Sequence, residues 1–394
     1  MNAYKKLLKN SGIFAIANIG SKIITIILVP FYTYVLTTEQ YGIIDMVMIS
    51  TSMLLPIITL SIFDATLRFA VKSQYTKKEI FTSSLVVVGL GNVIFLLFYP
   101  ILKKRSILSD YVCYFYMIVL FQTINQVIAQ FVRGIGKVKI FAINGVINTF
   151  ITVMLNIILL SWVKMGVKGY FISVLIANIV CTGYLMMSTK LWVYFSFNDY
   201  YHKLTKEMLV YSIPLIPNAL MWWIMNASDR YIITLFFGVS ANGLYAVANK
   251  VPSILNVLYS IFSQSWQLTA IEESNSKKKA QFYTNVFNAF SSMMLIIVSI
   301  VLCLIRPIVE LLFANDFNSI WKYVPFLLLA VVFTSFSSFL GINYIVMKKT
   351  KGTEMKNLKG STENSHLNLY SFRGLMLTLN FQQKSVNSGP DLIF

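Results

Sequence analysis

The sequence predicts an all-α polytopic membrane protein, with about ten transmembrane helices in two parallel-repeat bundles, the second of them truncated. Composition, long apolar segments and the placement of basic residues lead to this class. Of 394 residues, 57% are hydrophobic and 12% are charged, against roughly 45–50% and 25% in soluble domains. A soluble chain could not cover so much apolar surface. The net charge of +18 would suggest nucleic acid, but charge is too scarce and the apolar runs are too long for that class.

The predicted spans follow from the length that a bilayer requires. A helix needs about 20 mostly apolar residues to cross the hydrocarbon core. Short connections at 37–41 and 238–242 predict antiparallel neighbours. Ten segments have the required length, at 12–36, 42–67, 80–101, 111–132, 140–162, 168–190, 210–237, 243–270, 282–305 and 322–347.

Basic residues predict the orientation of these spans. Counting from the N-terminus, alternate loops hold nineteen Lys and Arg residues, and the opposite loops hold seven. Cytoplasmic loops carry the excess of positive charge in multi-pass proteins. We therefore expect a cytoplasmic N-terminus, with the cluster at 103–105 as the one local conflict.

An internal repeat at an offset of 201 residues predicts the domain organisation. It aligns Gly42 with Gly243 and also aligns the sequences of two short outer loops. Parallel repeats of this kind build transporters whose halves move about a central site. We expect a six-helix bundle at 1–195, a cytoplasmic linker at 196–208 and an incomplete four-helix bundle at 209–352.

Residues 353–394 do not continue the repeat, because they contain no apolar stretch long enough to span. Our hypothesis is that this tail arises from a frameshift, a truncation or a gene-model error and is largely disordered. The alternative is a genuine soluble tail. Reading the gene in the other two frames after Lys351 decides between them.

Charged residues inside spans are costly and mark pathways or pairs. The 1.5 Å rise per residue puts Arg230 and Lys250 roughly 10–12 Å below the outer surface and Lys22 about 20 Å below it. Three such cations would line a cavity suited to a phosphate or diphosphate. Apart from residues at the very ends of spans, the charged residues within the predicted spans are Lys22, Asp45, Asp64, Asp229, Arg230 and Lys250.

A structural alternative remains for these cations. Asp229 could neutralise Arg230 or Lys250 as an ion pair, while Lys22 reaches toward the membrane surface. Adjacent helical residues point about 100° apart. This favours an arrangement in which Asp229 binds a neighbour and Arg230 faces the lumen.

Three other charged side chains lie nearer the span ends. Asp64 and Arg68 are four residues apart, which predicts an interfacial ion pair or, alternatively, a cytoplasmic gate. Asp45 lies three residues after Gly42 and is expected to be solvated.

Amide side chains share faces with the charged residues. Asn226 lies four residues before Arg230, and Asn249 lies four residues after Tyr245. Such donors and acceptors suit a sugar. The alternative is that they join helix to helix.

Signals for enzymatic chemistry are missing from the sequence. There is no phosphate-binding G-x-x-x-x-G-K-[ST] loop. The histidines, His202 and His366, fall outside the spans. The three cysteines are far apart, and we interpret them as small hydrophobic residues; they are Cys113, Cys181 and Cys303. We expect no catalytic residue, metal or cofactor.

Three sequence segments resemble a known family. They are Lys-Asn-Ser-Gly-Ile-Phe-Ala-Ile-Ala-Asn at 9–18, Thr-Thr-Glu-Gln-Tyr-Gly at 37–42 and Asn-Ala-Ser-Asp-Arg-Tyr at 226–231. Together with the repeat, they resemble bacterial polysaccharide biosynthesis flippases. These are the Wzx-type O-antigen and capsule transporters of the multidrug/oligosaccharidyl-lipid/polysaccharide exporter superfamily. The resemblance covers residues 1 to about 352.

The resemblance implies a function in the bacterial cytoplasmic (inner) membrane. Such a protein moves an undecaprenyl-diphosphate-linked oligosaccharide to the outer leaflet by ion-coupled alternating access. Lumenal cations in the family are thought to receive the diphosphate, a role that falls here on Lys22, Arg230 and Lys250. Asp64, Asp229 and Arg68 become gate or coupling candidates. The expected partners are this lipid-linked substrate, membrane lipids and other polysaccharide assembly proteins, with no nucleic acid.

Rival functions remain open. A drug or cation exporter of the same superfamily would prefer an acidic cavity. A membrane-embedded glycosyltransferase or polymerase would need a large outer loop or an acidic catalytic cluster. A non-transporting remnant is the third rival, because of the tail.

Overall fold

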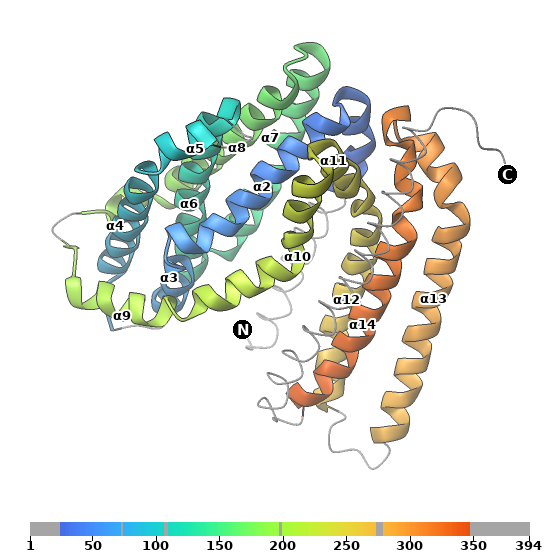
Figure 1. Ribbon diagram of the computed structural model, residues 1–394. Helices are drawn as coiled ribbons and strands as arrows, with labels where there is room; N and C mark the ends of the chain where they lie inside the picture. The colour runs from blue at the N-terminus through green and yellow to red at the C-terminus, as the bar shows by residue number, and fades with distance from the viewer. Residues whose placement is uncertain (1–23, 72–73, 106–108, 197–198, 273–278, 347–394) are drawn as a thin grey trace. The chain divides into compact units, whose positions relative to one another are not determined.

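The computed structural model describes residues 24–71, 74–105, 109–196, 199–272 and 279–346. Within these ranges the chain is helical and contains no β-strand. It divides into two compact units, Met1–Ala246 and Val247–Phe394. The predicted all-α polytopic class is confirmed (Figure 1).

The first unit holds most of the helices. The described part of its first helix is Ile24–Val35. The elements that follow are α2 (Thr38–Ile58), α3 (Ile62–Val71), α4 (Lys77–Leu96), α5 (Tyr99–Arg105), η1 (Ser109–Tyr111), α6 (Val112–Gly134), α7 (Val138–Asn156), η2 (Ile157–Trp162), α8 (Gly166–Thr189), η3 (Leu191–Tyr194), α9 (His202–Ser212), α10 (Leu215–Phe237) and α11 (Val239–Ala248).

Eight helices in the described ranges are long and apolar enough to cross a membrane. They overlap eight of the ten predicted spans, although His202–Met225 covers only the first part of the predicted span at 210–237. The predicted first span lies partly outside the described residues. The predicted span at 243–270 is divided at Asn249 into α11 and α12 (Lys250–Glu272).

Two helices begin at capping boxes that the sequence encodes. The Thr37 hydroxyl accepts a hydrogen bond from the backbone N–H of Gln40, and the Gln40 side chain accepts one from the N–H of Thr37. Thr76 and Glu79 make the same reciprocal bonds at the start of α4. Each box satisfies two backbone donors that a helix start leaves open, so the 37–42 motif marks the start of α2.

The predicted span at 42–67 is broken rather than continuous. α2 contains Pro56 and ends at Ile58, and α3 starts at Ile62. Between them Leu60 and Ser61 have φ angles of 50° and 51°. These left-handed conformations stop the α-helical hydrogen-bond ladder and redirect the chain.

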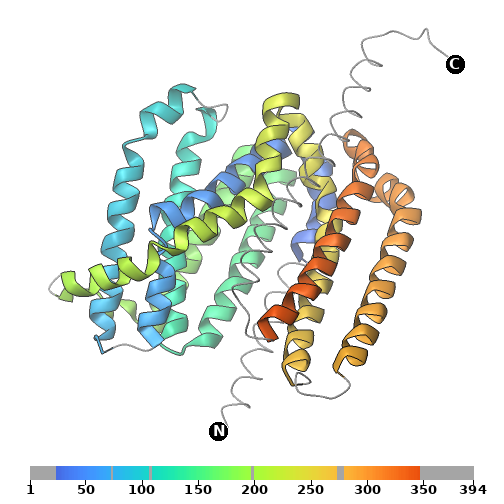
Figure 2. The same cartoon turned by 60° about the horizontal axis from the view of Figure 1, so that its bottom comes forward.

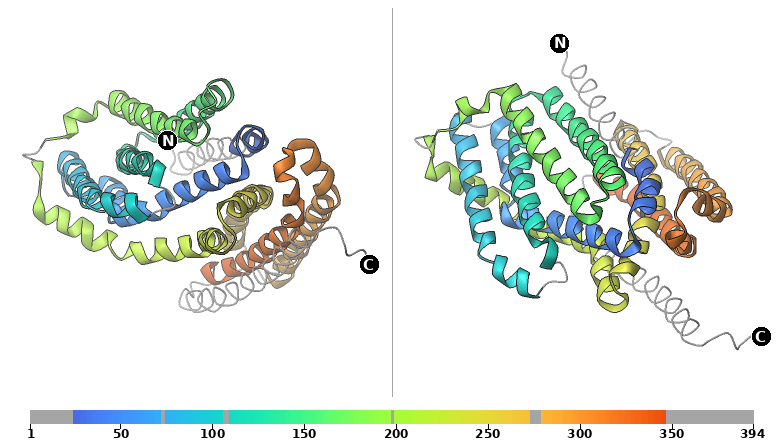
Figure 3. Two further views of the ribbon diagram at one scale, coloured as in Figure 1. Left: turned by 45° about the horizontal axis from the view of Figure 1, so that its top comes forward. Right: turned by 90° about the horizontal axis from the view of Figure 1, so that it is seen from above.

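The first unit is held together by a core between α3, α4 and α6. Ile62, Ile80 and Phe131 are fully buried there, and the rings of Phe81 and Phe131 lie 4.7 Å apart. Helices α6, α7 and α8 pack against one another (Figure 3).

The segment at 202–237 also belongs to this unit. α9 packs on α3 and α4, and α10 runs beside α2 (Figure 2). The division between compact units falls between Ala246 and Val247. The predicted repeat boundaries stay a prediction.

The second unit contains α12, α13 (Lys279–Leu312), η6 (Asn315–Lys322) and α14 (Val324–Val346). α14 packs against both α12 and α13. Its core is aromatic: Phe262 stacks on Phe290 at 4.5 Å, and Trp266 stacks on Phe339 at 4.8 Å. Such ring pairs add stability beyond the area they bury.

Candidate functional site

Two glycines allow the first turns of α2 and α11 to meet backbone to backbone. A Cβ atom on Gly42 would lie 2.1 Å from the carbonyl oxygen of Val239, and one on Gly243 would lie 1.9 Å from that of Thr38. Each glycine faces the residue four positions before the other. The contact is therefore self-complementary, as a twofold relation between equivalent segments requires. Gly42 and Gly243 are the positions that the repeat at offset 201 aligns.

The glycine contact buries polar residues beside it. Asn242 is fully buried, and its amide nitrogen lies 3.3 Å from the carbonyl oxygen of Gly42 and 3.4 Å from Oδ2 of Asp45. Arg230 approaches from α10, with its Nε 2.8 Å from the same carboxylate oxygen. The side chains of Arg230 and Asp45 are 12% and 11% exposed. Asp45 is thus a largely buried acceptor with two donors.

A second carboxylate joins this arrangement through a tyrosine. The guanidinium carbon of Arg230 lies 5.8 Å from the centre of the Tyr245 ring. The Tyr245 hydroxyl donates to Oδ2 of Asp229 at 2.8 Å. We call Asp45, Asp229, Arg230, Asn242 and Tyr245 the Asp45–Arg230 cluster. With one cation and two carboxylates, it carries a formal excess of one negative charge.

The α2–α10 interface continues from this cluster with satisfied polar groups. The indole N–H of Trp223 donates to the carbonyl oxygen of Ile49 at 3.1 Å. The hydroxyl groups of Ser50 and Tyr231 are hydrogen-bonded to each other. The Thr234 hydroxyl donates to the Arg230 carbonyl oxygen at 2.7 Å. These bonds hold the two helices in register.

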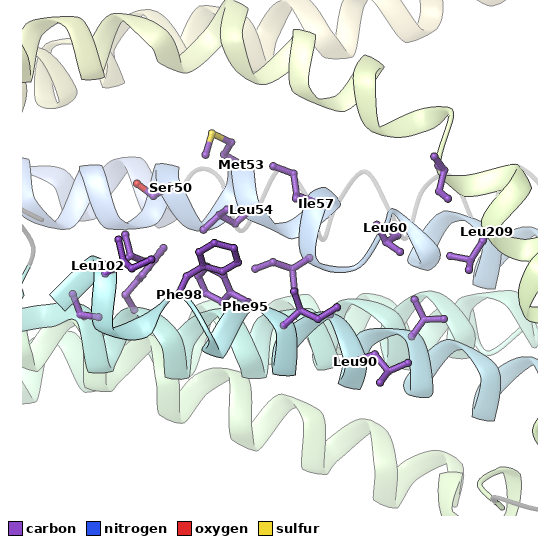
Figure 4. A pocket seen from close by; sticks show the side chains of 18 of the residues that line it. Ser50, Met53, Leu54, Ile57, Leu60, Leu90, Phe95, Phe98, Leu102 and Leu209 are labelled. Carbon is purple, nitrogen blue, oxygen red and sulfur yellow. The ribbon is translucent and has the colours of Figure 1, made fainter. Parts of the chain in front are cut away.

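A cavity of about 1380 Å³ lies beside this interface. Its walls come from α2, α4, α5, α9 and α10, with contributions from α6 and Val239. Figure 4 shows Met53, Leu54 and Ile57 of α2 facing Phe95 and Phe98 across it. The walls are almost entirely apolar.

Comparison with known proteins identifies the family. Residues 7–266 match the family described as polysaccharide biosynthesis protein. The chain belongs to this family. No protein of curated function matches the sequence.

Solved structures place the family member in a known fold. A MATE in complex with MaL6 is 14% identical, with a TM-score of 0.58 over 88% of this chain and 83% of that chain. A mutant of the Vibrio cholerae MATE transporter VcmN is 14% identical, with a TM-score of 0.54 over 98% and 97%. A MATE in the straight conformation is 13% identical, with a TM-score of 0.54 over 92% and 96%. These likenesses establish the fold. Family and fold together indicate a multi-pass membrane exporter or flippase.

The cluster corrects the expected exposure of Asp45 and the expected partner of Arg230. Asp45 is not solvated: the glycine contact brings Asn242 over it, and α10 supplies Arg230. The partner of Arg230 that the sequence did not identify is therefore Asp45. Asp229 lies next to Arg230 on α10 and binds Tyr245.

The predicted pair near the cytoplasmic end does not form. Among the residues that the structure describes, Arg68 makes no ion pair with Asp64. Its guanidinium carbon lies 4.3 Å from the ring centre of Tyr211 on α9. An aromatic face attracts a guanidinium by cation–π attraction, and α9 provides one where the sequence suggested a carboxylate. The gate role of both residues stays a prediction.

The remaining predicted residues are scattered. Lys22 lies outside the described residues. Asn226 lies on α10, and Asn249 lies at the break between α11 and α12. Lys250 opens α12 in the second unit, where its carbonyl oxygen accepts a hydrogen bond from the Ser253 hydroxyl at 2.6 Å.

Asp45 and Asn242 are the residues that reasoning from the sequence missed. The sequence feature that could have revealed them is the pair of glycines, Gly42 and Gly243. Glycines at equivalent positions of a repeat indicate close approach of two backbones, and a side chain one turn away is then covered. Judged only by distance from the loop, Asp45 looked accessible.

Proposed function

We propose that the protein moves an undecaprenyl-diphosphate-linked oligosaccharide repeat unit from the cytoplasmic to the outer leaflet of the bacterial cytoplasmic membrane. Transport is by ion-coupled alternating access and serves the synthesis of O-antigen, capsule or a similar surface polysaccharide. The observation that carries this proposal is membership of the polysaccharide biosynthesis protein family in a chain with an exporter fold. The protein acts without enzymatic chemistry, together with other polysaccharide assembly proteins.

Arg230 is the residue to which the proposal assigns the diphosphate. A guanidinium binds phosphate through two parallel hydrogen bonds. Its present partner is Asp45, at 2.8 Å, so phosphate must displace this carboxylate. A proton taken up by Asp45 would weaken the pair and release Arg230. Phosphate on Arg230 and a proton on Asp45 each break this ion pair, so binding of one favours binding of the other, which couples them.

Supporting roles follow from the sequence. Lys22 and Lys250 add positive charge for the diphosphate, and Asn226 and Asn249 offer amide groups to the sugar. Asp64, Arg68 and Asp229 serve as gate or coupling groups. Each of these roles is tested by substitution in the same assay as Arg230.

The experiment replaces the gene in its own host. Deletion is expected to abolish surface polysaccharide and to accumulate undecaprenyl-diphosphate-linked repeat units. The wild-type gene restores polysaccharide, and Arg230→Gln does not, although the protein is still present in the membrane. Normal polysaccharide after deletion would overturn the proposal. Glycosyltransferase genes next to this one would further support it.

A second candidate function has one observation in its favour. The Asp45–Arg230 cluster holds two carboxylates and one cation, and an excess of negative charge attracts cations. A cation exporter would therefore be a reasonable use of the same cluster. In that case deletion leaves polysaccharide intact and raises the cellular accumulation of a cationic dye.

A further inference from the structure

The cavity beside α2 has the length of a lipid chain. Its α2 wall extends from Ile43 to Ile58, which at 1.5 Å per residue is about 22 Å. Its volume of about 1380 Å³ exceeds the roughly 300–1,000 Å³ of ordinary small-molecule sites. Opposite α2, Leu90, Ile94 and Phe98 line it and are more than half exposed. An elongated apolar occupant would cover these side chains.

The polar atoms within the walls are already satisfied. Ser50 and Tyr231 bind each other, and Thr234 donates to the Arg230 carbonyl oxygen. A small polar molecule would therefore find few partners in the middle of the cavity. An apolar chain leaves none of these groups unsatisfied.

One end of the cavity differs from the rest. There α9 contributes His202 and Lys206, which are four residues apart and thus on the same face of the helix. Both side chains are exposed. Among the described residues, no acidic side chain pairs with Lys206. A cationic mouth on an apolar cavity is complementary to an amphiphile with an anionic head.

We propose that this cavity binds the isoprenoid chain of the lipid-linked substrate on loading, with its phosphate at Lys206 and His202 before the phosphate reaches Arg230. The proposal rests on the proposed function for the identity of the lipid. Basic residues around α9 are expected in the cytoplasm, which is where the substrate is assembled. The mouth would then receive the phosphate on the loading side, while the chain lies along α2, α4 and α5.

The test uses a photoreactive polyprenyl phosphate with the full-length protein in vesicles of phosphatidylethanolamine and phosphatidylglycerol. Labelling is expected on the α2 and α4 segments that line the cavity. Leu90→Trp fills the cavity and should reduce labelling about tenfold, equivalent to about 1.4 kcal/mol.

Leu96→Trp is the matched control. Leu96 lies on the same helix and is 55% exposed, against 60% for Leu90, but does not line the cavity. It should leave labelling unchanged. Both variants must elute as single species at wild-type yield, and Ile94→Trp replaces Leu90→Trp if the latter does not fold.

Two further labelling comparisons identify the ligand. Lys206→Gln should weaken labelling by polyprenyl phosphate but not by the uncharged polyprenol. A photoreactive phosphatidylglycerol should label the cavity poorly. Equal labelling by phosphatidylglycerol, or labelling that Leu90→Trp does not change, would overturn the proposal and make the cavity a lipid-facing surface.

The labelling and polysaccharide measurements distinguish a failure of this proposal from a failure of the proposed function. Labelling is measured without transport. Specific labelling in a protein that moves no oligosaccharide supports the chain site and refutes the flippase. Full polysaccharide synthesis by Leu90→Trp retains the flippase and refutes the chain site.

Discussion

Burial decides how much the Asp45–Arg230 ion pair contributes to the stability of the fold. Side chains that are 11% and 12% exposed lose most of their hydration, and their mutual attraction offsets that cost. Removing one partner leaves the other charge buried, which typically costs about 3–5 kcal/mol. The pair is therefore a strong constraint on how α2 and α10 sit together, and releasing it requires a compensating proton or anion.

We predict strong coupling between these two residues. Asp45→Asn and Arg230→Gln should each lower the thermal midpoint, and the double variant should lose less than the two single losses combined. The expected coupling energy is about 1–3 kcal/mol. It is measured by a double-variant cycle of thermal unfolding in detergent.

The exposed pair Arg306–Glu310 provides the matched control. Its atoms are 2.9 Å apart, against 2.8 Å for Arg230 and Asp45, but its side chains are 67% and 52% exposed. Its cycle should give about 0–0.5 kcal/mol. Equal coupling in both cycles would contradict the argument from burial.

At the residue scale, the sequence predicted the cations better than their partners. Arg230 and Asp229 stood out because charge inside a long apolar run is costly. The pairing of Arg230 with Asp45 depends on which helices meet, and no local pattern encodes that. The same reason explains Arg68, whose partner Tyr211 lies on a helix distant in sequence.

At the scale of helices, the glycine contact fixes how closely α2 and α11 approach. The distances of 2.1 and 1.9 Å from a hypothetical Cβ to a carbonyl oxygen leave no space for any side chain. A larger residue must push the two helix ends apart. This would also uncover Asn242 and weaken its contact with Asp45.

We expect Gly42→Ala and Gly243→Ala to destabilise the protein by about 1–3 kcal/mol each, as overpacking does. Both should also impair transport. Gly145→Ala on α7 is the control, because in the described part of the chain no atom beyond its own stretch of helix lies within 4 Å of the added methyl group. That change should be neutral or stabilise by up to about 1 kcal/mol, since alanine favours helix. The three thermal midpoints are compared, and equal effects would refute the close contact.

The break between α2 and α3 stores backbone strain. Leu60 and Ser61 adopt left-handed φ angles, which cost a non-glycine residue about 1–2 kcal/mol. Ser61 is 1% exposed, and its hydroxyl has no hydrogen-bond partner among the described residues. No hydrogen bond of this side chain therefore offsets the strain.

Ser61→Gly is therefore expected to raise stability, by about 1 kcal/mol. Ser83→Gly on α4 is a matched comparison. Ser83 is also 1% exposed with an unpartnered hydroxyl, but it lies within a regular helix. There glycine should lower stability by about 0.5–1 kcal/mol. Thermal midpoints that shift in the same direction would argue against strain at the break.

Long apolar runs made the helices predictable, whereas their interruptions were not. Eight predicted spans correspond to helices long enough to cross a membrane. The break at Leu60 and Ser61 contains no glycine, and that at Asn249 contains no proline. Hydropathy reports only how apolar a segment is, so it does not reveal where either helix breaks.

For the whole molecule, the distribution of charge predicts how the chain crosses the bilayer. Nineteen basic residues lie in one set of loops and seven in the other, which predicts a cytoplasmic location for the first set. Lys203 belongs to the first set and Lys164 to the second, and α8 alone separates them as a candidate span. The two positions must therefore lie on opposite sides of the membrane. The orientation of every other span follows from theirs.

We test this with single cysteines at the two positions, Lys164→Cys and Lys203→Cys, in a chain whose native cysteines are serine. Both lysines are exposed, so access to reagent depends on the membrane alone. In intact cells a membrane-impermeant maleimide should label position 164 and spare position 203. After permeabilisation both should react equally. The reverse pattern would invert the topology and move His202 and Lys206 to the outer face, where no newly assembled substrate could reach them.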